Sequence, residues 1–336
     1  RIQSRGDFDR LKDKGYRFDS WLGGYGLEKN FEEYLRGSDG AVLIEVDVRG
    51  RPLLLGEAST DGKDSQRIQA LPLIEDPYPG NVMELTVDHR LIVTAHAALT
   101  ASPSGAGSVV ALDPVSGAIR VLVSTPGFDP NSYIRLASGG KELSRAEFPR
   151  ALTGVYPPGS VFKVITAIAA LEMGIDPARK FRCTGEFRLP NRAVKCWKKE
   201  GHGLCDFIAG LQNSCDVYFY NAGLFAGGQE ISDWARRFGL GQSLFVKEFP
   251  EWSKQGFIPT PIWKEVKKKE SWYPGDTINL SIGQAEVLAT PLQLAMLYAA
   301  IANRGKMPQP HLVRALRDPS TGGAFWEYSP KEADLS

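Results

Sequence analysis

The chain has 336 residues, of which 43% are hydrophobic and 24% are charged, and its formal net charge is +1. This composition is typical of a folded protein with room for two domains, and it excludes a disordered chain. The near-neutral charge leaves no basic surface of the kind that binds nucleic acid, so we expect no nucleic-acid partner. No apolar stretch is long enough to cross a bilayer. Because the chain begins at Arg1 and not at methionine, we interpret its N-terminus as removed.

Residues 1–80 predict a small, extended domain in which short strands surround one helix. The helix is amphipathic and is expected over 26–35, and residues 41–48 alternate apolar and polar side chains as a strand does. The sequence Pro-Tyr-Pro-Gly over 77–80 marks the end of the domain. We identify no catalytic group within it.

The remainder of the chain, 81–336, predicts a second domain that contains both strands and helices. A cap, a proline, a glycine or a turn marks most ends of these elements. The elements are a strand over 82–85, a helix over 86–99 that starts near Thr86 or Asp88, a hairpin of strands 108–112 and 118–124, a helix over 229–238 and a helix over 292–302. Together they predict an α+β fold, with helices on the faces of a sheet.

The segment Tyr-Pro-Pro-Gly-Ser-Val-Phe-Lys over 156–163 leads into an apolar helix and places Ser160 at its start. Residues three apart are neighbours on a helix, so the Lys163 amine is expected to reach the Ser160 hydroxyl. A serine hydroxyl needs a base before it attacks, and a lysine among apolar side chains gives up its proton more easily. This pattern indicates a serine acyl-transfer centre. The alternative is a serine that caps a core helix beside a snorkelling lysine.

A second motif, Gln-Asn-Ser-Cys-Asp over 212–216, precedes another apolar run. Penicillin-binding proteins and class A β-lactamases share the set Ser-x-x-Lys, Ser-Asp-Asn and Lys-Thr-Gly. Ser214 and Asp216 would provide the second element in the form Ser-x-Asp. The alternative is an ordinary serine at a helix start.

Further segments match one protein family in order along nearly the whole chain. They are Gly-Leu-Glu-Lys at 26–29 with Leu-Arg-Gly at 35–37, Leu-Thr-Val-Asp at 85–88, residues 107–112, Phe-Asp-Pro-Asn at 128–131, Trp-Lys-Lys-Glu-Gly-His-Gly at 197–203, Gly-Asp-Thr-Ile-Asn at 275–279, Ile-Gly-Gln at 282–284 and residues 289–295. The chain therefore resembles the class B penicillin-binding proteins, and among them the elongation-type D,D-transpeptidases of rod-shaped bacteria.

The resemblance implies a pedestal, dimerisation-type domain over 1–80 and a transpeptidase domain over 81–336, whose antiparallel sheet lies between helices. Ser160 would attack the bond between two terminal D-alanines of a peptidoglycan stem peptide, and an amine on a neighbouring strand would capture the acyl-enzyme. Lys163 would activate Ser160, Ser214 would relay a proton to the leaving amine, and Asp216 would order that wall. β-Lactams would acylate Ser160.

The resemblance also implies partners and a location. Catalysis needs no cofactor. The membrane glycan polymerase and other proteins of the elongation complex would bind the protein. It would face the periplasm from the bacterial inner membrane, although this chain contains no anchor.

The third family motif, Lys-Thr-Gly, should follow the helix at 292–302, but the chain ends at Ser336 without it. Arg304-Gly305-Lys306 does not match the motif. We therefore expect the transpeptidase domain to lack its C-terminal strands. Because the loss of one oxyanion-hole donor costs about a hundred- to a thousandfold in rate, this polypeptide is expected to have little or no transpeptidase activity, in contrast to the intact protein.

The four cysteines, Cys183, Cys196, Cys205 and Cys215, lie between the two motifs, with His202 among them. A protein in an oxidising compartment avoids cysteine, pairs it or binds metal with it. Zinc favours four Cys and His ligands, so Cys183, Cys196, His202 and Cys215 are candidate ligands of a structural zinc ion. Cys205 could replace one of them. Some relatives carry a zinc site in this loop, and disulfides and free thiols remain open alternatives.

Other functions remain open. A serine β-lactamase or D,D-carboxypeptidase would use the same Ser-x-x-Lys with water as acceptor, and a β-lactam sensor or scaffold would need no turnover. Five tryptophans are interpreted as core or groove packing, with a place in a peptide-binding cleft as the alternative: Trp197, Trp234, Trp252, Trp263 and Trp272. The basic run over 264–270 is interpreted as a solvated surface, and contact with an anionic lipid or polymer is its alternative.

Overall fold

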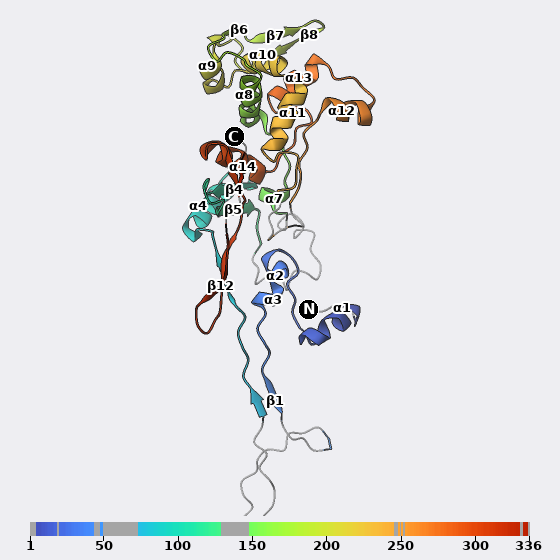
Figure 1. The fold of residues 1–336 in the computed structure, drawn as a ribbon, viewed down its shortest axis with the longest axis vertical. Coiled ribbons are helices and arrows are strands. Elements are labelled where there is room, and N and C mark those ends of the chain that lie inside the picture. Colours follow the sequence, from blue (N-terminus) through green and yellow to red (C-terminus); the bar gives the residue numbers. More distant parts are fainter. Residues whose placement is uncertain are drawn as a thin grey trace, which may run out of the picture. The chain divides into compact units, whose positions relative to one another are not determined.

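The computed structural model describes residues 5–18, 20–43, 48–49, 73–128, 148–244, 248, 250, 253–329 and 332–334. The chain forms two compact units (Figure 1). Unit 1 comprises Arg1–Leu85 and Val313–Tyr328, and unit 2 comprises Thr86–Leu312 and Ser329–Ser336. Both units contain helices together with antiparallel strand pairs, so the α+β prediction is confirmed.

Unit 1 contains the predicted N-terminal helix in two pieces, because the backbone leaves the helical region at Phe31. The strand predicted over 41–48 is present at its start, and residues 44–47 lie outside the described residues. The elements of unit 1 are α1 Arg5–Leu11, the 3₁₀ helix η1 Lys12–Lys14, α2 Gly26–Asn30, α3 Glu32–Leu35, β1 Ala41–Leu43, β2 Leu73–Glu75, β3 Val82–Leu85, β11 Val313–Arg317 and β12 Ala324–Glu327.

The strands of unit 1 form two antiparallel sheets. β1 pairs with β2, while β11 is the central strand between β12 and β3. Glu84 of β3 accepts from Arg314 at 2.7 Å and from Arg317 at 2.9 Å, which joins the first and last parts of this unit. Hydrogen bonds from these two guanidinium groups lower the pKa of Glu84.

Unit 2 begins with helix and hairpin elements close to the predicted ones. Asp88 caps α4 by accepting from the backbone N–H of Arg90 and Leu91, so the helix starts at Asp88 and not at Thr86. The hydroxyl of Thr86 is buried and donates to the carbonyl of Ile119 instead. The predicted hairpin is confirmed as β4 and β5, which pair from Gly107↔Thr125 to Leu112↔Ile119 and contact α4 and α14.

The first elements of unit 2 are α4 His89–Thr100, β4 Gly107–Leu112, β5 Ile119–Thr125, α7 Arg150–Thr153, the 3₁₀ helix η2 Gly159–Phe162 and α8 Lys163–Glu172. They are followed by β6 Phe181–Cys183, β7 Glu186–Leu189, β8 Arg192–Lys195, β9 Gly203–Cys205, α9 Phe207–Gln212, α10 Asp216–Ala226 and α11 Gly228–Arg237. The last are α12 Pro261–Trp263, the π-helix η4 Lys264–Lys268, α13 Pro274–Ser281, α14 Pro291–Ala302, β10 Lys306–Pro308 and β13 Glu332–Asp334.

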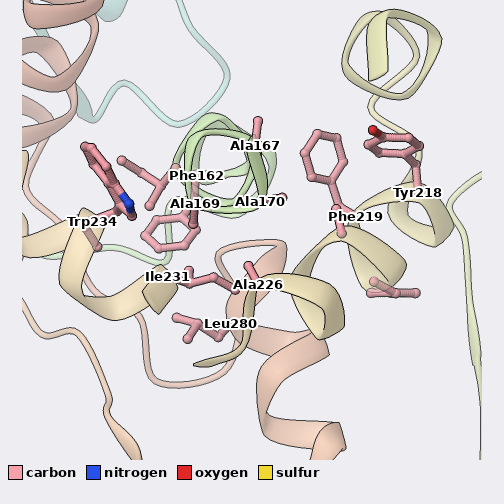
Figure 2. Packing of buried hydrophobic residues seen from close by; sticks show 14 of the residues in the cluster. Phe162, Ala167, Ala169, Ala170, Tyr218, Phe219, Ala226, Ile231, Trp234 and Leu280 are labelled. Atoms are coloured by element: carbon pink, nitrogen blue, oxygen red, sulfur yellow. The ribbon is translucent and has the colours of Figure 1, made fainter. Parts of the chain in front are cut away.

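A cluster of buried hydrophobic residues lies among α8, α10, α11 and α13 (Figure 2). Alanines on one face of α8 let its neighbours approach closely, and Ile231 and Trp234 line the buried face of α11. A Cβ atom at Gly223 of α10 would lie only 2.4 Å from the Cβ of Ser281, so a glycine is needed where α10 meets α13. This cluster supports the N-terminal turn of α8.

The segment between α8 and α10 forms two short antiparallel pairs, β6 with β9 and β7 with β8. Sequence analysis predicted no strands here, because each has only three or four residues. Within the described part of the chain, no helix combines the length and apolarity that a bilayer crossing demands.

Helices 229–238 and 292–302 are confirmed as α11 and α14. Gly239 follows α11 with a φ of 79°, and Thr290 caps α14 in a reciprocal capping box with Gln293.

We expect Ile231→Ala to lower the free energy of unfolding by about 2–5 kcal/mol, because it leaves a cavity in the fully buried cluster. Chemical denaturation measures this change. Ile262→Ala is the matched control, since that side chain is 66% exposed and its loss should change stability by less than about 0.5 kcal/mol. Equal effects of the two variants would show that the cluster does not stabilise the fold.

Candidate active site and cysteine cluster

Ser160 lies on a short 3₁₀ turn, η2, directly ahead of α8. The turn is held from two sides. The N–H of Gly159 donates to the carbonyl of Gly283 at 2.9 Å, and the Tyr298 hydroxyl donates to the carbonyl of Val161 at 3.0 Å. A Cβ atom at Gly283 would lie 2.4 Å from the Gly159 carbonyl oxygen, so only glycine permits this approach. The position of Ser160 is therefore fixed by the backbone around it.

Lys163 is the first residue of α8, and its side chain is 1% exposed. Its Nζ donates to the carbonyl of Ser214 at 2.7 Å, to Ser214 Oγ at 2.9 Å and to Asp216 Oδ1 at 2.6 Å. These three bonds match the donor capacity of an ammonium group. A buried charge without such partners would cost several kcal/mol. The three acceptors therefore allow the charged lysine to be buried.

Ser214 lies between α9 and α10 and has a φ of 49°, a left-handed conformation that is uncommon for residues other than glycine. Such a conformation costs about 1–3 kcal/mol and persists only where surrounding contacts impose it. Ser214 Oγ lies 2.8 Å from Ser160 Oγ. A continuous hydrogen-bonded chain, which we call the relay, therefore joins Lys163, Ser214 and Ser160.

The expected direct contact between Lys163 and Ser160 is not what the structure shows. Among the described residues, each hydrogen bond of Lys163 Nζ goes to Ser214 or Asp216. The carboxylate and the Ser214 carbonyl are the stronger acceptors, and they direct the amine toward the start of α10. The Ser214 hydroxyl bridges the remaining gap to Ser160.

Asp216 is the first residue of α10, where a negative charge is favoured by the helix dipole. Both carboxylate oxygens are engaged. Oδ1 pairs with Lys163, and Oδ2 accepts from the backbone N–H of Trp197 at 3.0 Å. Asp216 therefore orients Lys163 and also ties the loop at Trp197 to the relay.

The four candidate ligands Cys183, Cys196, His202 and Cys215 lie together, with one potential ligand atom from each within 4.8 Å of the others. His202 Nδ1 is 3.6 Å from the sulfur of Cys183 and also from that of Cys196. Ligand atoms around a tetrahedral zinc ion with bonds of 2.0–2.3 Å lie about 3.5–3.8 Å apart. The spacing and the donor set therefore fit a zinc ion.

The protonation of His202 and Cys183 also suits a cation, whereas the raised pKa of Cys215 does not. Burial lowers the pKa of His202, and the charge of Lys198 lowers it further, which favours the neutral imidazole that can ligate. Burial raises the pKa of Cys183, but hydrogen bonds from the N–H groups of Gly185 and His202 outweigh it, so the net pKa lies below the usual value. Burial raises the pKa of Cys215.

Cys205, the alternative ligand, lies outside this group of four, and its thiol is directed at the carbonyl of His202 at 3.8 Å. All four cysteines are buried and free. Within the described residues they form no disulfide.

Sequence reasoning did not identify Trp197, Gly283 and Tyr298 as parts of the site. The indole N–H of Trp197 donates to the carbonyls of Asn213 and Ser214, each at 3.2 Å. The available signals were its place directly after Cys196 and at the head of the matched segment 197–203, which suggested a place in a cleft but no contact with Ser214. Gly283 and Tyr298 are distant from Ser160 in the sequence, and nothing local indicates that they meet its turn.

Two family models match the chain. The penicillin binding protein transpeptidase domain matches residues 107–334, and the penicillin-binding protein dimerisation domain matches residues 2–69. The peptidoglycan D,D-transpeptidase MrdA of Acinetobacter baumannii is 36% identical over 304 residues, which are 88% of this chain and 42% of that protein. The MrdA protein of Escherichia coli is 31% identical, over 91% of this chain and 47% of that protein.

Solved structures agree with these matches. Pseudomonas aeruginosa PBP2 in complex with WCK 5153 has a TM-score of 0.69 and 27% identity, over 93% of this chain and 64% of that one. The complex between PBP2 and MreC from Helicobacter pylori gives a TM-score of 0.71 and 25% identity, over 95% and 57%. The chain spans less than half the length of the curated relatives it matches. Its matched domains and their order show that it belongs to the penicillin-binding protein transpeptidase family.

Proposed function

We propose that the protein is a peptidoglycan D,D-transpeptidase that cross-links stem peptides during cell elongation. The observation that carries this proposal is the relay, which connects a buried lysine to the Ser160 hydroxyl in a chain of this family. The similarity to MrdA proteins supports the reaction type. The assignments of 1–80 as pedestal and 81–336 as transpeptidase domain remain part of the proposal.

The relay supports a two-step acyl transfer. Once Lys163 has lost a proton, its amine accepts from Ser214, and Ser214 accepts from Ser160, so that the hydroxyl proton moves toward Lys163 as Ser160 Oγ attacks the carbonyl carbon. The proton then returns through Ser214 to the amine of the departing D-alanine. An acceptor amine attacks the acyl-enzyme, loses its proton to the same relay and releases Ser160. Asp216 holds Lys163 in place throughout.

A structural zinc ion at Cys183, Cys196, His202 and Cys215 is the second part of the proposal. It would hold the loop that contains β6–β9, and through Cys215 it would fix the backbone between Ser214 and Asp216. Its role there would be structural, because these four side chains would supply all four ligands that a structural zinc ion takes.

The proposed substrates and partners follow the family. Stem peptides and β-lactams would both react at Ser160, and the membrane glycan polymerase and other elongation-complex proteins would bind the protein. The solved PBP2–MreC complex and the match to a peptidoglycan synthase complex support such partners. The location would be the periplasmic face of the inner membrane.

The function is tested with a labelled penicillin on the protein expressed from its complete gene. We expect one stable adduct per molecule on Ser160, and none on Ser160→Ala, by intact-mass measurement. With a stem peptide that ends in D-Ala-D-Ala as the donor in place of penicillin, transfer of its acyl group to an acceptor amine then supports the transpeptidase. Rapid turnover of the penicillin would instead indicate a β-lactamase, and a stable adduct with no acceptor transfer would indicate a sensor.

Asp216→Ala tests the pairing of the buried lysine. Removal of one partner of a buried ion pair leaves Lys163 uncompensated, so we expect a loss of about 3–5 kcal/mol in unfolding free energy together with slower acylation. Asp233→Ala is the control, because its exposed carboxylate accepts, among the described residues, from Gln229 on the same helix. If both variants matched the wild type, the pairing would have no role.

The zinc ion is tested by metal analysis of protein purified without chelator. We expect about one zinc per molecule, lost with Cys183→Ser and retained with Cys205→Ser, because Cys205 lies outside the four ligands. Chelation should lower the unfolding temperature of the wild type. Folded wild-type protein without zinc, or equal loss of zinc in the two variants, would contradict the site.

A further inference from the structure

Trp197 combines an exposed ring with an unusually complete set of polar contacts. Its side chain is 63% exposed, so burial of apolar surface does not account for its position. Its backbone N–H donates to Asp216 Oδ2 at 3.0 Å, and its indole N–H is shared between the carbonyls of Asn213 and Ser214 at 3.2 Å. Every polar hydrogen of this residue is therefore directed at the segment that carries the relay.

Trp197 and Lys163 share the Ser214 carbonyl oxygen as their acceptor. It accepts from Lys163 Nζ at 2.7 Å and from the Trp197 indole at 3.2 Å, which occupies both of its lone pairs. The left-handed backbone of Ser214 is strained for a residue with a side chain, and it needs such external contacts to persist. A rotation of this peptide would withdraw its carbonyl from Lys163 Nζ, the group that also donates to Ser214 Oγ.

Further contacts hold the indole ring of Trp197 in place. Trp197 follows Cys196, whose N–H donates to the carbonyl of Gly185, and its ring contacts the His202 imidazole edge to face, with centroids 5.2 Å apart. These contacts fix the ring although most of it faces solvent. A tryptophan fixed in this way can serve as a rigid donor at small cost in side-chain entropy.

We propose that Trp197 is a positioning residue for the relay. Its indole N–H holds the Ser214 peptide in the conformation that places Ser214 Oγ between Lys163 and Ser160. This inference rests on the proposed acyl-transfer function and adds to it a residue outside the motifs that define the reaction.

The test removes the indole N–H and keeps an aromatic side chain at position 197. Trp197→Phe removes the donor, and a site-specific β-(3-benzothienyl)alanine at position 197 removes only the N–H, because sulfur replaces nitrogen in a ring of the same shape. Trp326→Phe is the matched control, since Trp326 is a 40% exposed tryptophan on β12 in unit 1. All variants are made in the protein expressed from its complete gene.

The first readout separates binding of a slow penicillin from its acylation step. We expect the acylation rate constant of both position-197 variants to fall about three- to tenfold, the size of one lost hydrogen bond. The pre-acylation binding constant of the benzothienyl variant, its zinc content and its unfolding temperature should stay at wild-type values. An unchanged acylation constant in both variants would overturn the proposal, as would a fall that is matched by Trp326→Phe.

The second readout does not depend on catalysis. Amide hydrogen exchange of the peptide that spans 211–217 should be faster in both position-197 variants than in the wild type and in Trp326→Phe. If wild-type protein is not acylated, the proposed function fails, and this exchange measurement alone decides whether Trp197 holds Ser214. Unchanged exchange would overturn the positioning role even where acylation of the wild type succeeds.

Discussion

The burial of one positive charge imposes the arrangement of the site. Lys163 lies at the start of an apolar helix with almost no exposure to solvent, and a charge there needs acceptors from elsewhere in the chain. Ser214, which precedes α10, supplies two of them, and Asp216, the first residue of α10, supplies the third. Only Cys215 separates Ser214 from Asp216 in the sequence. One short segment therefore both compensates the charge of Lys163 and presents a hydroxyl to Ser160.

Two neighbouring networks share this segment. The side chains of Ser214 and Asp216 contact Lys163, whereas that of Cys215 belongs to the cysteine cluster. Trp197, in the loop after β8, links the same two regions, since it follows Cys196 and donates to Asp216. The backbone geometry at the relay is therefore set by contacts on both sides, which is how a strained conformation at Ser214 is maintained.

The sequence was sufficient for those features that depend on local chemistry. Asp88, Thr290 and Gly239 mark helix ends through caps and conformations that can be read from neighbouring residues, and the hairpin of β4 and β5 follows from its turn. The identities of Ser160, Lys163, Ser214 and Asp216 came from motifs. The geometry of these four residues could not be predicted from the motifs. Ser214 bridges Lys163 and Ser160 because its backbone is left-handed, and a serine in the sequence does not indicate that conformation. The strands β6–β9 were missed because they are too short to show a period.

The division of the chain into units has a practical meaning. The path passes from unit 1 to unit 2 after Leu85, returns at Val313 and leaves again after Tyr328. β11, which supplies the centre of the three-stranded sheet, thus comes from a late part of the sequence. A polypeptide cut after residue 85 would keep β3 but lose its hydrogen-bonding neighbour, and Glu84 would lose both arginines. The first unit can consequently be isolated intact only if the distant hairpin is grafted back onto it.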